Sequence, residues 1–202
     1  MAGPSTASRV DGRLARGERA RGAIVDALLD LLEAGELRPS AARIAERAGV
    51  SLRSVFQHFS DVETLFATAA ERQKVRLMPL VRPISLDGPL AERIAAFASQ
   101  RAKVLEAITP VRRAAILMEP FSRELHVRLA SFRNDKGAEV QRVFAREIAA
   151  RPSASRRPLV AALVVASGWT TWQGLREHQG LDRTQARRVL AHMLTALLHE
   201  ER

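Results

Sequence analysis

The side chains with the clearest chemical potential are Arg53, Ser54 and Gln57, which fall on one face of a short predicted helix. A guanidinium can bind O6 and N7 of guanine through two parallel hydrogen bonds, and a carboxamide can bind N6 and N7 of adenine in the same way. The opposite face of the segment is apolar, as packing against a protein core requires. This division indicates a helix that reads DNA bases. A helical hairpin packed only for stability is the plainer interpretation.

Residues 40–59, SAARIAERAGVSLRSVFQHF, contain the elements that position such a helix. They predict a helix capped by Ser40, a turn at Gly49 and a second helix over 52–58, which together form a helix-turn-helix. Gly49 tolerates the positive φ of a tight turn, and Ala45 is small where the two helices approach each other. The space between the helices is filled by apolar side chains: Ile44, Val50 and Val55.

This segment resembles the DNA-binding domain of the TetR family of bacterial transcriptional regulators, whose signature reads IAxxAGVSxxxxYxHFxxKxxL. The matching residues are the run Ile44-Ala-Glu-Arg-Ala-Gly-Val-Ser51, the run Val55-Phe56-Gln57-His58-Phe59, and Leu65. The resemblance covers residues 40–66. It implies an ω-shaped all-α homodimer that binds a palindromic double-stranded operator as a repressor and responds to a small-molecule effector.

Carried over residue by residue, the resemblance gives Ser40 and Arg43 phosphate contacts and turns the recognition helix 52–58 toward the major groove. The assigned DNA-binding residues are Ser40, Arg43, Ser51, Leu52, Arg53, Ser54, Phe56, Gln57 and His58. Two positions depart from the family: its tyrosine is Phe56 here and its lysine is Val62. We therefore expect a weaker grip on the DNA backbone, with the amides at the start of the next helix still able to hold a phosphate.

Five arginines precede the helix-turn-helix, at positions 9, 13, 16, 19 and 21. They suggest an N-terminal arm that crosses the DNA backbone or enters the minor groove, and a solvated polar tail is the alternative. Residues 1–15 are predicted to be disordered because they are polar.

The second half of the chain holds most of the large side chains, and these lie either around an effector pocket or in the core. The predicted pocket residues are Phe97, Leu105, Ile116, Phe121, Leu125, Phe132, Trp169 and Trp172. At least one indole N–H needs a hydrogen-bond partner. Basic residues such as Arg101, Arg112, Arg113 and Arg128 are interpreted as solvated surface, with an anionic ligand as the alternative.

The last two predicted helices have apolar faces wider than one buried stripe requires, which favours a dimer interface. The residues assigned to it are Leu159, Leu163, Val189, Met193 and Leu197. His192 and His199 are interpreted as interface-rim residues, and no metal site is expected because no carboxylate and histidine cluster accompanies them.

Composition excludes several other functions. The 202 residues contain no cysteine, which removes disulfides and thiolate metal sites, and no stretch is apolar enough to predict a membrane span. The N-terminus has no apolar signal segment, so a cytoplasmic protein is expected.

Residues 1–78 hold 12 of the 32 Lys and Arg and 10 of the 22 Asp and Glu, so most of the net charge of +10 lies outside the proposed DNA-binding segment. Charge alone therefore does not identify that segment.

No enzyme signature is present: GxSxG, HExxH and the P-loop are all missing, and no cofactor is expected. Two alternative functions remain. One is a ligand- or protein-binding module that has lost specific DNA binding, and the other is an all-α enzyme whose site is assembled from distant residues.

Helical spacing recurs along the chain and predicts an all-α fold of about nine helices. A helix over 17–34 precedes the helix-turn-helix, and a capping box of Ser60 and Glu63 is expected to start the next one. Prolines predict a helix break at Thr109-Pro110, one long helix over 121–150 and another from Pro158 to 178. Asp182 and Gln185 should cap the last helix.

The expected domains are a disordered arm at 1–15, a DNA-binding domain at 16–78, a linker at 79–89 and a ligand-binding and dimerisation domain at 90–202.

Overall fold

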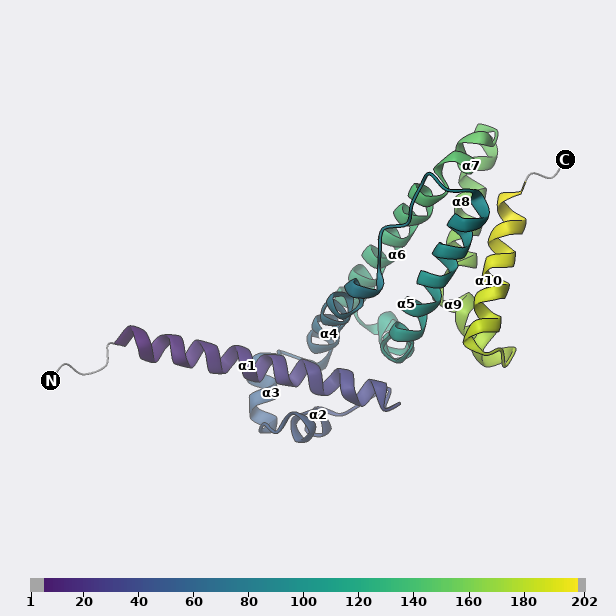
Figure 1. Ribbon diagram of the computed structural model, residues 1–202. Helices are drawn as coiled ribbons and strands as arrows, with labels where there is room; N and C mark the ends of the chain where they lie inside the picture. Colours follow the sequence, from purple (N-terminus) through teal and green to yellow (C-terminus); the bar gives the residue numbers. More distant parts are fainter. Residues whose placement is uncertain (1–5, 200–202) are drawn as a thin grey trace. The chain divides into compact units, whose positions relative to one another are not determined.

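The computed structural model describes residues 6–199, with side chains from residue 14 onward. Within this range the chain forms ten α-helices and no strand, which confirms the predicted all-α class (Figure 1). The helices are α1 (Thr6–Glu33), α2 (Ala41–Ala48), α3 (Leu52–His58), α4 (Val62–Leu77), α5 (Leu90–Met118), α6 (Arg123–Val143), α7 (Ala145–Ala150), α8 (Ser153–Ala166), α9 (Trp169–Gln173) and α10 (Arg183–Leu198). None of the described helices has the length and apolarity needed to cross a bilayer.

The helices form two compact units that do not follow the chain in simple order. The first contains the chain up to Arg76 together with Pro110–Arg128, and the second contains Leu77–Thr109 and Leu129–Arg202. This differs from the linear division at 79–89, because Val111 and Ala114 of α5 are buried in the N-terminal core. Helix α5 therefore contributes to both units.

The first unit is built around α1, which packs on α2 and α3. Ile24, Leu28 and Leu32 recur one turn apart on α1 and are fully buried. They meet Ile44 of α2 and Leu65 of α4 in one apolar cluster. This spacing is the predicted core face of the first helix, and it fixes the base on which α2 and α3 rest.

The second unit has two buried clusters. In one, the rings of Phe97 and Phe144 meet edge to face, with centroids 5.3 Å apart, beside Leu163 of α8 and Leu190 of α10. The other contains apolar residues of α5, α9 and α10: Ala102, Leu105, Trp169, Trp172 and Ala186. Asp182 and Gln185 form the predicted capping box at the start of α10.

Helix α1 begins at Thr6 rather than near residue 17, so residues 6–15 are helical where disorder was expected. The prediction took polarity as a sign of disorder. Alanine, arginine and leucine, which make up half of this segment, are among the best helix formers, and the segment extends a helix that is already fixed further along by buried residues. Residues 1–5 of the expected arm lie outside the described part of the chain.

Two proline positions also differ from expectation, because α5 continues through Pro110 and α8 through Pro158. Pro110 cannot donate to the carbonyl of Glu106, so a helix break was predicted. Buried residues on both sides, Leu105 and Val111, hold the helix together instead. The predicted break was wrong because tertiary packing outweighs the missing hydrogen bond.

The helices around residues 144 and 167 are interrupted where the sequence predicted continuity. Phe144 leaves the helical conformation with φ −111° and ψ 25°, and its buried ring packs on Phe97. The helix expected from 158 to 178 instead ends at Ala166, where the buried Ser167 hydroxyl donates to the carbonyl of Leu163 at 2.7 Å. A π-helical turn, Gly174–His178, follows α9.

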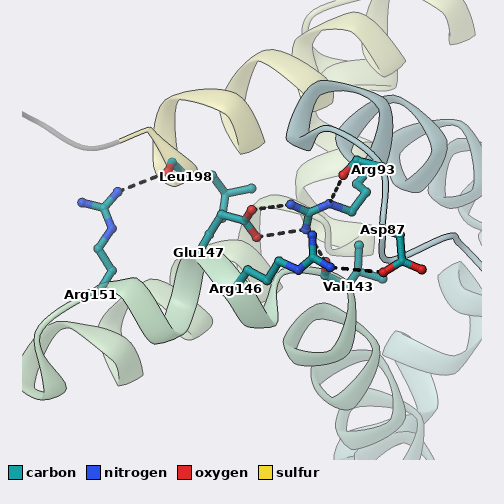
Figure 2. A network of polar contacts seen from close by, with 8 residues as sticks. Asp87, Arg93, Val143, Arg146, Glu147, Arg151 and Leu198 are labelled. Carbon is teal, nitrogen blue, oxygen red and sulfur yellow. Dashed lines mark hydrogen bonds and ion pairs between the residues drawn. The ribbon is translucent and has the colours of Figure 1, made fainter.

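A polar network in the second unit attaches α7 to the start of α5 (Figure 2). The Arg93 guanidinium is 5% exposed, donates to the Val143 carbonyl at 2.8 Å and forms an ion pair with Glu147. The hydrogen bonds that Arg93 donates to the Glu147 carboxylate hold the pKa of Glu147 below its usual range. Arg146 pairs with Asp87 at 3.2 Å beside it. The network explains why α7 keeps a fixed place after the break at Phe144.

Candidate nucleic-acid interface

Serines cap both helices of the predicted helix-turn-helix. The Ser40 hydroxyl accepts from the Arg43 amide at 3.2 Å, and the Ser51 hydroxyl accepts from the Ser54 amide at 3.1 Å. Gly49 ends α2 with φ +66°, as predicted. A Cβ at this position would meet no atom within 4 Å, so the glycine is required by backbone conformation and not by crowding.

The inner faces of α2 and α3 are packed as the sequence indicated. Ile44, Ala45 and Val55 are at most 3% exposed. Phe59, just after α3, is buried below the Arg21 guanidinium of α1, whose carbon lies 4.8 Å from the ring centroid. This cation–π contact fixes the end of α3 against α1. The recognition helix is therefore held from below by apolar packing and from one end by an arginine.

The outer face of α3 presents four of the predicted DNA-binding side chains to solvent. Arg53 and Gln57 are exposed, and neither has a hydrogen bond or ion pair within the described residues. Leu52 and Phe56 are 45% and 51% exposed one turn apart. The helix thus carries two unpaired polar groups and two apolar ones toward solvent.

The remaining predicted residues near this helix are engaged or less accessible. Ser51 is exposed but caps the helix, and Ser54 is half-buried. His58 is half-buried against α1, where its Cε1 lies 3.9 Å from the position that a Cβ on Gly17 would occupy. Ser54 and His58 are therefore less open to solvent than Arg53 and Gln57.

Arg43, predicted to contact a phosphate, is engaged by carboxylates on the surface. It donates to Glu46 at 2.8 Å and to Glu36 at 3.4 Å. These hydrogen bonds raise the pKa of Arg43 above its ordinary value, and the bond to Glu46 has the largest effect. A phosphate at this place must replace two acidic partners.

The start of α4 is capped by Asp61 and not by the predicted pair of Ser60 and Glu63. The Asp61 carboxylate accepts from the Thr64 amide at 2.6 Å and from the Ser60 hydroxyl at 2.8 Å. These hydrogen bonds lower the pKa of Asp61, and the bond from the Thr64 amide has the largest effect. A carboxylate already occupies the positive end of this helix, so the expectation that its amides hold a phosphate is not favoured.

The eight predicted pocket residues do not come together in one cluster. Leu105, Trp169 and Trp172 pack together, whereas Phe97 belongs to the other cluster of the second unit. Phe132 is half-buried in the second unit. The others belong to the first unit, with Leu125 buried, Ile116 39% exposed and Phe121 76% exposed.

One indole has the partner that the sequence analysis required. Trp169 Nε1 donates to the Thr109 hydroxyl at 3.1 Å. Trp172 Nε1 is buried and has no hydrogen-bond partner within the described residues. A separate hollow of about 260 Å³ lies in the first unit between α1 and α4, lined by residues such as Arg21, Val25 and Val75.

The predicted dimer residues divide in a similar way. Leu159, Val189, Met193 and Leu197 are half-buried on α8 and α10. Leu163 is fully buried within the single chain, so it belongs to the core and its assignment to an interface is corrected. Val165, on the outer side of α8, is 67% exposed and was not selected from the sequence.

Sequence reasoning also missed the burial of two arginines. Arg93 forms the network described above, and Arg101, expected on the surface, is 9% exposed and donates to the Ser167 carbonyl at 3.2 Å. Burial lowers the pKa of Arg101. The expectation of a solvated Arg101 was wrong because its partner is 66 residues away in the chain and leaves no local signal. By contrast, Arg112 and Arg128 are paired with glutamates at the surface or partly below it.

Comparison with solved structures gives matches over most of the chain. A TetR-family transcriptional regulator from Streptomyces coelicolor superposes with a TM-score of 0.71 and 20% sequence identity, covering 89% of this chain and 80% of that one. A transcriptional regulator from Rhodococcus sp. Rha1 gives a TM-score of 0.67 and 18% identity, covering 90% of this chain and 95% of that one. This chain has the TetR-family fold. No family model and no curated protein matches its sequence.

At this level of identity the likeness concerns the TetR fold alone. The helix-turn-helix predicted from the run Ile44–Ser51 is present as α2 and α3 within that fold. Function must therefore be argued from the residues of this chain.

Proposed function

We propose that this protein is a DNA-binding transcriptional regulator that reads its operator with α3. The observation that carries the proposal is that Arg53 and Gln57 are both exposed and have no partner within the described residues. The helix that holds them is fixed by Val55 on its inner face and by Gly49 in the preceding turn. A rigid helix with free hydrogen-bonding groups suits major-groove recognition. Phe56 adds an apolar contact suited to a thymine methyl group.

The operator is proposed to be palindromic because the regulator acts as a homodimer. The TetR fold packs α8 against α10, and both present half-buried or exposed apolar side chains: Leu159, Val165, Val189, Met193 and Leu197. Pairing of these faces would cover them. Two copies of α3 would then occupy successive major grooves, about 34–36 Å apart.

The effector is proposed to be a small molecule bound in the second unit, with repression as the unliganded state. The cluster of Leu105, Trp169 and Trp172 supports this, since it is apolar and holds one buried indole N–H that has no partner within the described residues. An effector that prefers the non-binding state would lower DNA affinity by about 1–3 kcal/mol. We propose a cytoplasmic location, where the chromosome is accessible.

Fluorescence anisotropy tests DNA reading directly. A duplex from the region upstream of the protein's own gene is compared with a scrambled duplex of equal length, across a salt series. Replacing Arg53 by alanine should weaken operator binding by about 1–3 kcal/mol, roughly 5- to 150-fold, because the bidentate contact to guanine is lost. Binding to the scrambled duplex should change much less.

Arg123→Ala is the matched control, since Arg123 is an exposed arginine of the first unit outside α3. It should leave the preference for the operator unchanged. Equal losses in R53A and R123A, or a wild-type protein that binds the upstream duplex and the scrambled duplex equally, would contradict the proposal.

A protein-binding module of the same fold is the second candidate. Leu52 and Phe56 form an exposed apolar pair on α3, and Asp61 places a negative charge where a phosphate was expected. Phosphate neutralisation produces steep salt dependence, whereas an apolar protein contact does not. A flat salt series with weak binding to every duplex would favour this second function.

A further inference from the structure

We propose that the effector of this protein is a carboxylic acid with an apolar body, and that Arg101 of α5 is the residue that binds its carboxylate. The inference rests on the proposed function, since it names the class of effector that the second unit would bind. It starts from a buried side chain whose hydrogen bonds are left incomplete by the rest of the described chain. The residues involved all lie within the second unit: Arg101, Leu105, Ser167, Trp169 and Trp172.

The Arg101 guanidinium is buried with most of its donors unused. The residue is 9% exposed, and the one hydrogen bond that it makes within the described residues runs from Nη2 to the Ser167 carbonyl at 3.2 Å. Its Nε–H is buried without a partner, and Arg101 forms no ion pair with any residue that the structure describes. A guanidinium has donors on each nitrogen, and a buried charge without a counter-charge is costly. Burial accordingly lowers the pKa of Arg101.

Arg93 shows how the same chain satisfies a buried arginine that has a structural role (Figure 2). It also lies on α5, and it donates to the Gly88 carbonyl at 3.1 Å and to the Val143 carbonyl at 2.8 Å. In addition it forms an ion pair with the Glu147 carboxylate. Arg101 has a backbone carbonyl and no carboxylate. The partner that it lacks is therefore of the kind that Glu147 supplies to Arg93.

The acidic side chain whose charge acts on Arg101 is engaged elsewhere. Glu139 of α6 favours the charged form of Arg101 and so opposes the lowering of its pKa, but the Glu139 carboxylate accepts from Gln100 Nε2 at 2.9 Å instead. A second cation reaches the same end of α8, since Lys136 donates to the Val164 carbonyl at 2.9 Å. The charge of Lys136 would offset that of Glu139 near a carboxylate bound at Arg101.

The surroundings of Arg101 determine the rest of the ligand. Ala102, next to Arg101, belongs to the apolar cluster that contains Leu105, Trp169 and Trp172. Trp172 Nε1 is the other buried side-chain nitrogen or oxygen of the second unit that has no partner among the described residues, and it is also a donor. Since both unused groups are donors, the missing molecule must supply acceptors together with an apolar surface. A carboxylate on a hydrocarbon or aromatic body has both properties.

The test measures the binding of simple acids to the full-length protein by isothermal titration calorimetry, without DNA. The probes are acetate, butanoate, octanoate, benzoate and phenylacetate. Each is compared with its primary amide, which has nearly the same shape and no charge. The wild type should bind at least one acid about 10- to 150-fold more tightly than its amide, as expected for hydrogen bonds between charged groups.

Two variants of Arg101 assign the preference to this residue. Arg101→Met removes the charge and keeps an unbranched side chain, so the acid should lose its advantage over the amide. Arg101→Lys keeps the charge and a donor for Ser167 but loses the planar pair of donors, so it should retain part of the preference. Circular dichroism confirms that each variant is folded, and R101K still gives the answer if R101M is not.

Arg142→Met is the matched control, because Arg142 is an exposed arginine of the second unit, on α6. It should bind the acid as the wild type does. Three results would overturn the inference: no acid that binds more tightly than its amide, an unchanged preference in the variants of Arg101, or an equal loss in R142M.

A second measurement separates this site from the proposed function. The acid that binds is added to the complex with the operator duplex, and it should lower DNA affinity by about 5- to 150-fold in the anisotropy assay. Unchanged DNA affinity would show that the acid is not the effector. A wild-type protein that binds the acid through Arg101 but binds operator and scrambled duplexes equally would contradict the regulatory function and leave the carboxylate site in place.

Discussion

At the scale of single residues, Asp61 shows how one carboxylate can change the interpretation of a helix end. Its side chain accepts from the Thr64 amide, so the first turn of α4 is stabilised by a negative charge inside the protein. The neighbouring Ser60 only supports that carboxylate through its hydroxyl. The residue that caps the helix is thus the one that repels an incoming phosphate.

Replacing Asp61 by alanine should lower the free energy of unfolding by about 0.5–2 kcal/mol at neutral pH, the usual effect of losing an N-cap. The pKa of Asp61 is lowered in the folded protein, so its contribution is complete above the unfolded pKa and is lost as the pH falls through the folded one. Urea unfolding of both proteins at several pH values measures the difference, which should shrink toward zero in acid.

Ser60→Ala is the control, and it should have a smaller effect than D61A. The reverse order would restore the capping box first predicted from Ser60 and Glu63. A difference that is independent of pH would show that the carboxylate's charge is not responsible.

The sequence predicts a residue's role in the site when the interactions that fix that residue lie within a few positions along the chain. Gly49 and Ser40 act within a few residues of themselves, and the structure has the turn and the cap as expected. Asp61 lies one residue from the predicted cap, which is the usual precision for a helix boundary. Arg101 could not be placed, because its burial depends on Ser167 in another helix.

At the scale of elements, α5 is the helix that the sequence describes least well. Pro110 removes one backbone donor, yet the helix continues for 29 residues from Leu90 to Met118. The Thr109 hydroxyl, which donates to the Leu105 carbonyl at 2.7 Å, supplies a hydrogen bond next to the missing one. The position of a proline predicts which backbone hydrogen bond a helix loses, but it does not predict the tertiary packing that outweighs this loss.

Pro110→Ala should raise the free energy of unfolding by about 2–3 kcal/mol. Alanine restores the amide donor to Glu106 and is about 3 kcal/mol better than proline in a helix interior, while the more flexible unfolded chain offsets up to about 1 kcal/mol. Thermal or urea unfolding measures this. A less stable variant would mean that the native backbone needs the bend that proline imposes.

At the scale of the whole molecule, the proposed dimer would place two recognition helices on one palindromic operator. Leu163 lies in the core of the single chain, so the proposed interface would use the outer sides of α8 and α10. Val165 is the most exposed large apolar residue of α8. Its exposure, which the width of the apolar pattern in the sequence does not predict, makes Val165 the residue with which to test the proposed surface.

Val165→Glu should convert the dimer to a monomer, because it places a charge in an interface that otherwise covers apolar surface. Sedimentation velocity measures the mass directly. Val127→Glu is the matched control, since Val127 is 60% exposed in the first unit, and this variant should remain dimeric. A wild-type monomer, or a dimeric V165E protein, would contradict the proposed assembly.

The placement of both tryptophans in α9 has an optical consequence. The chain contains two tryptophans and no tyrosine, so its ultraviolet emission comes almost entirely from five consecutive residues, Trp169–Gln173. One indole donates to Thr109 and the other is buried without a partner, so any rearrangement of α5 against α9 changes the polarity around a chromophore. The protein therefore carries an intrinsic spectroscopic probe in its second unit, and a compound library can be screened against it without a label.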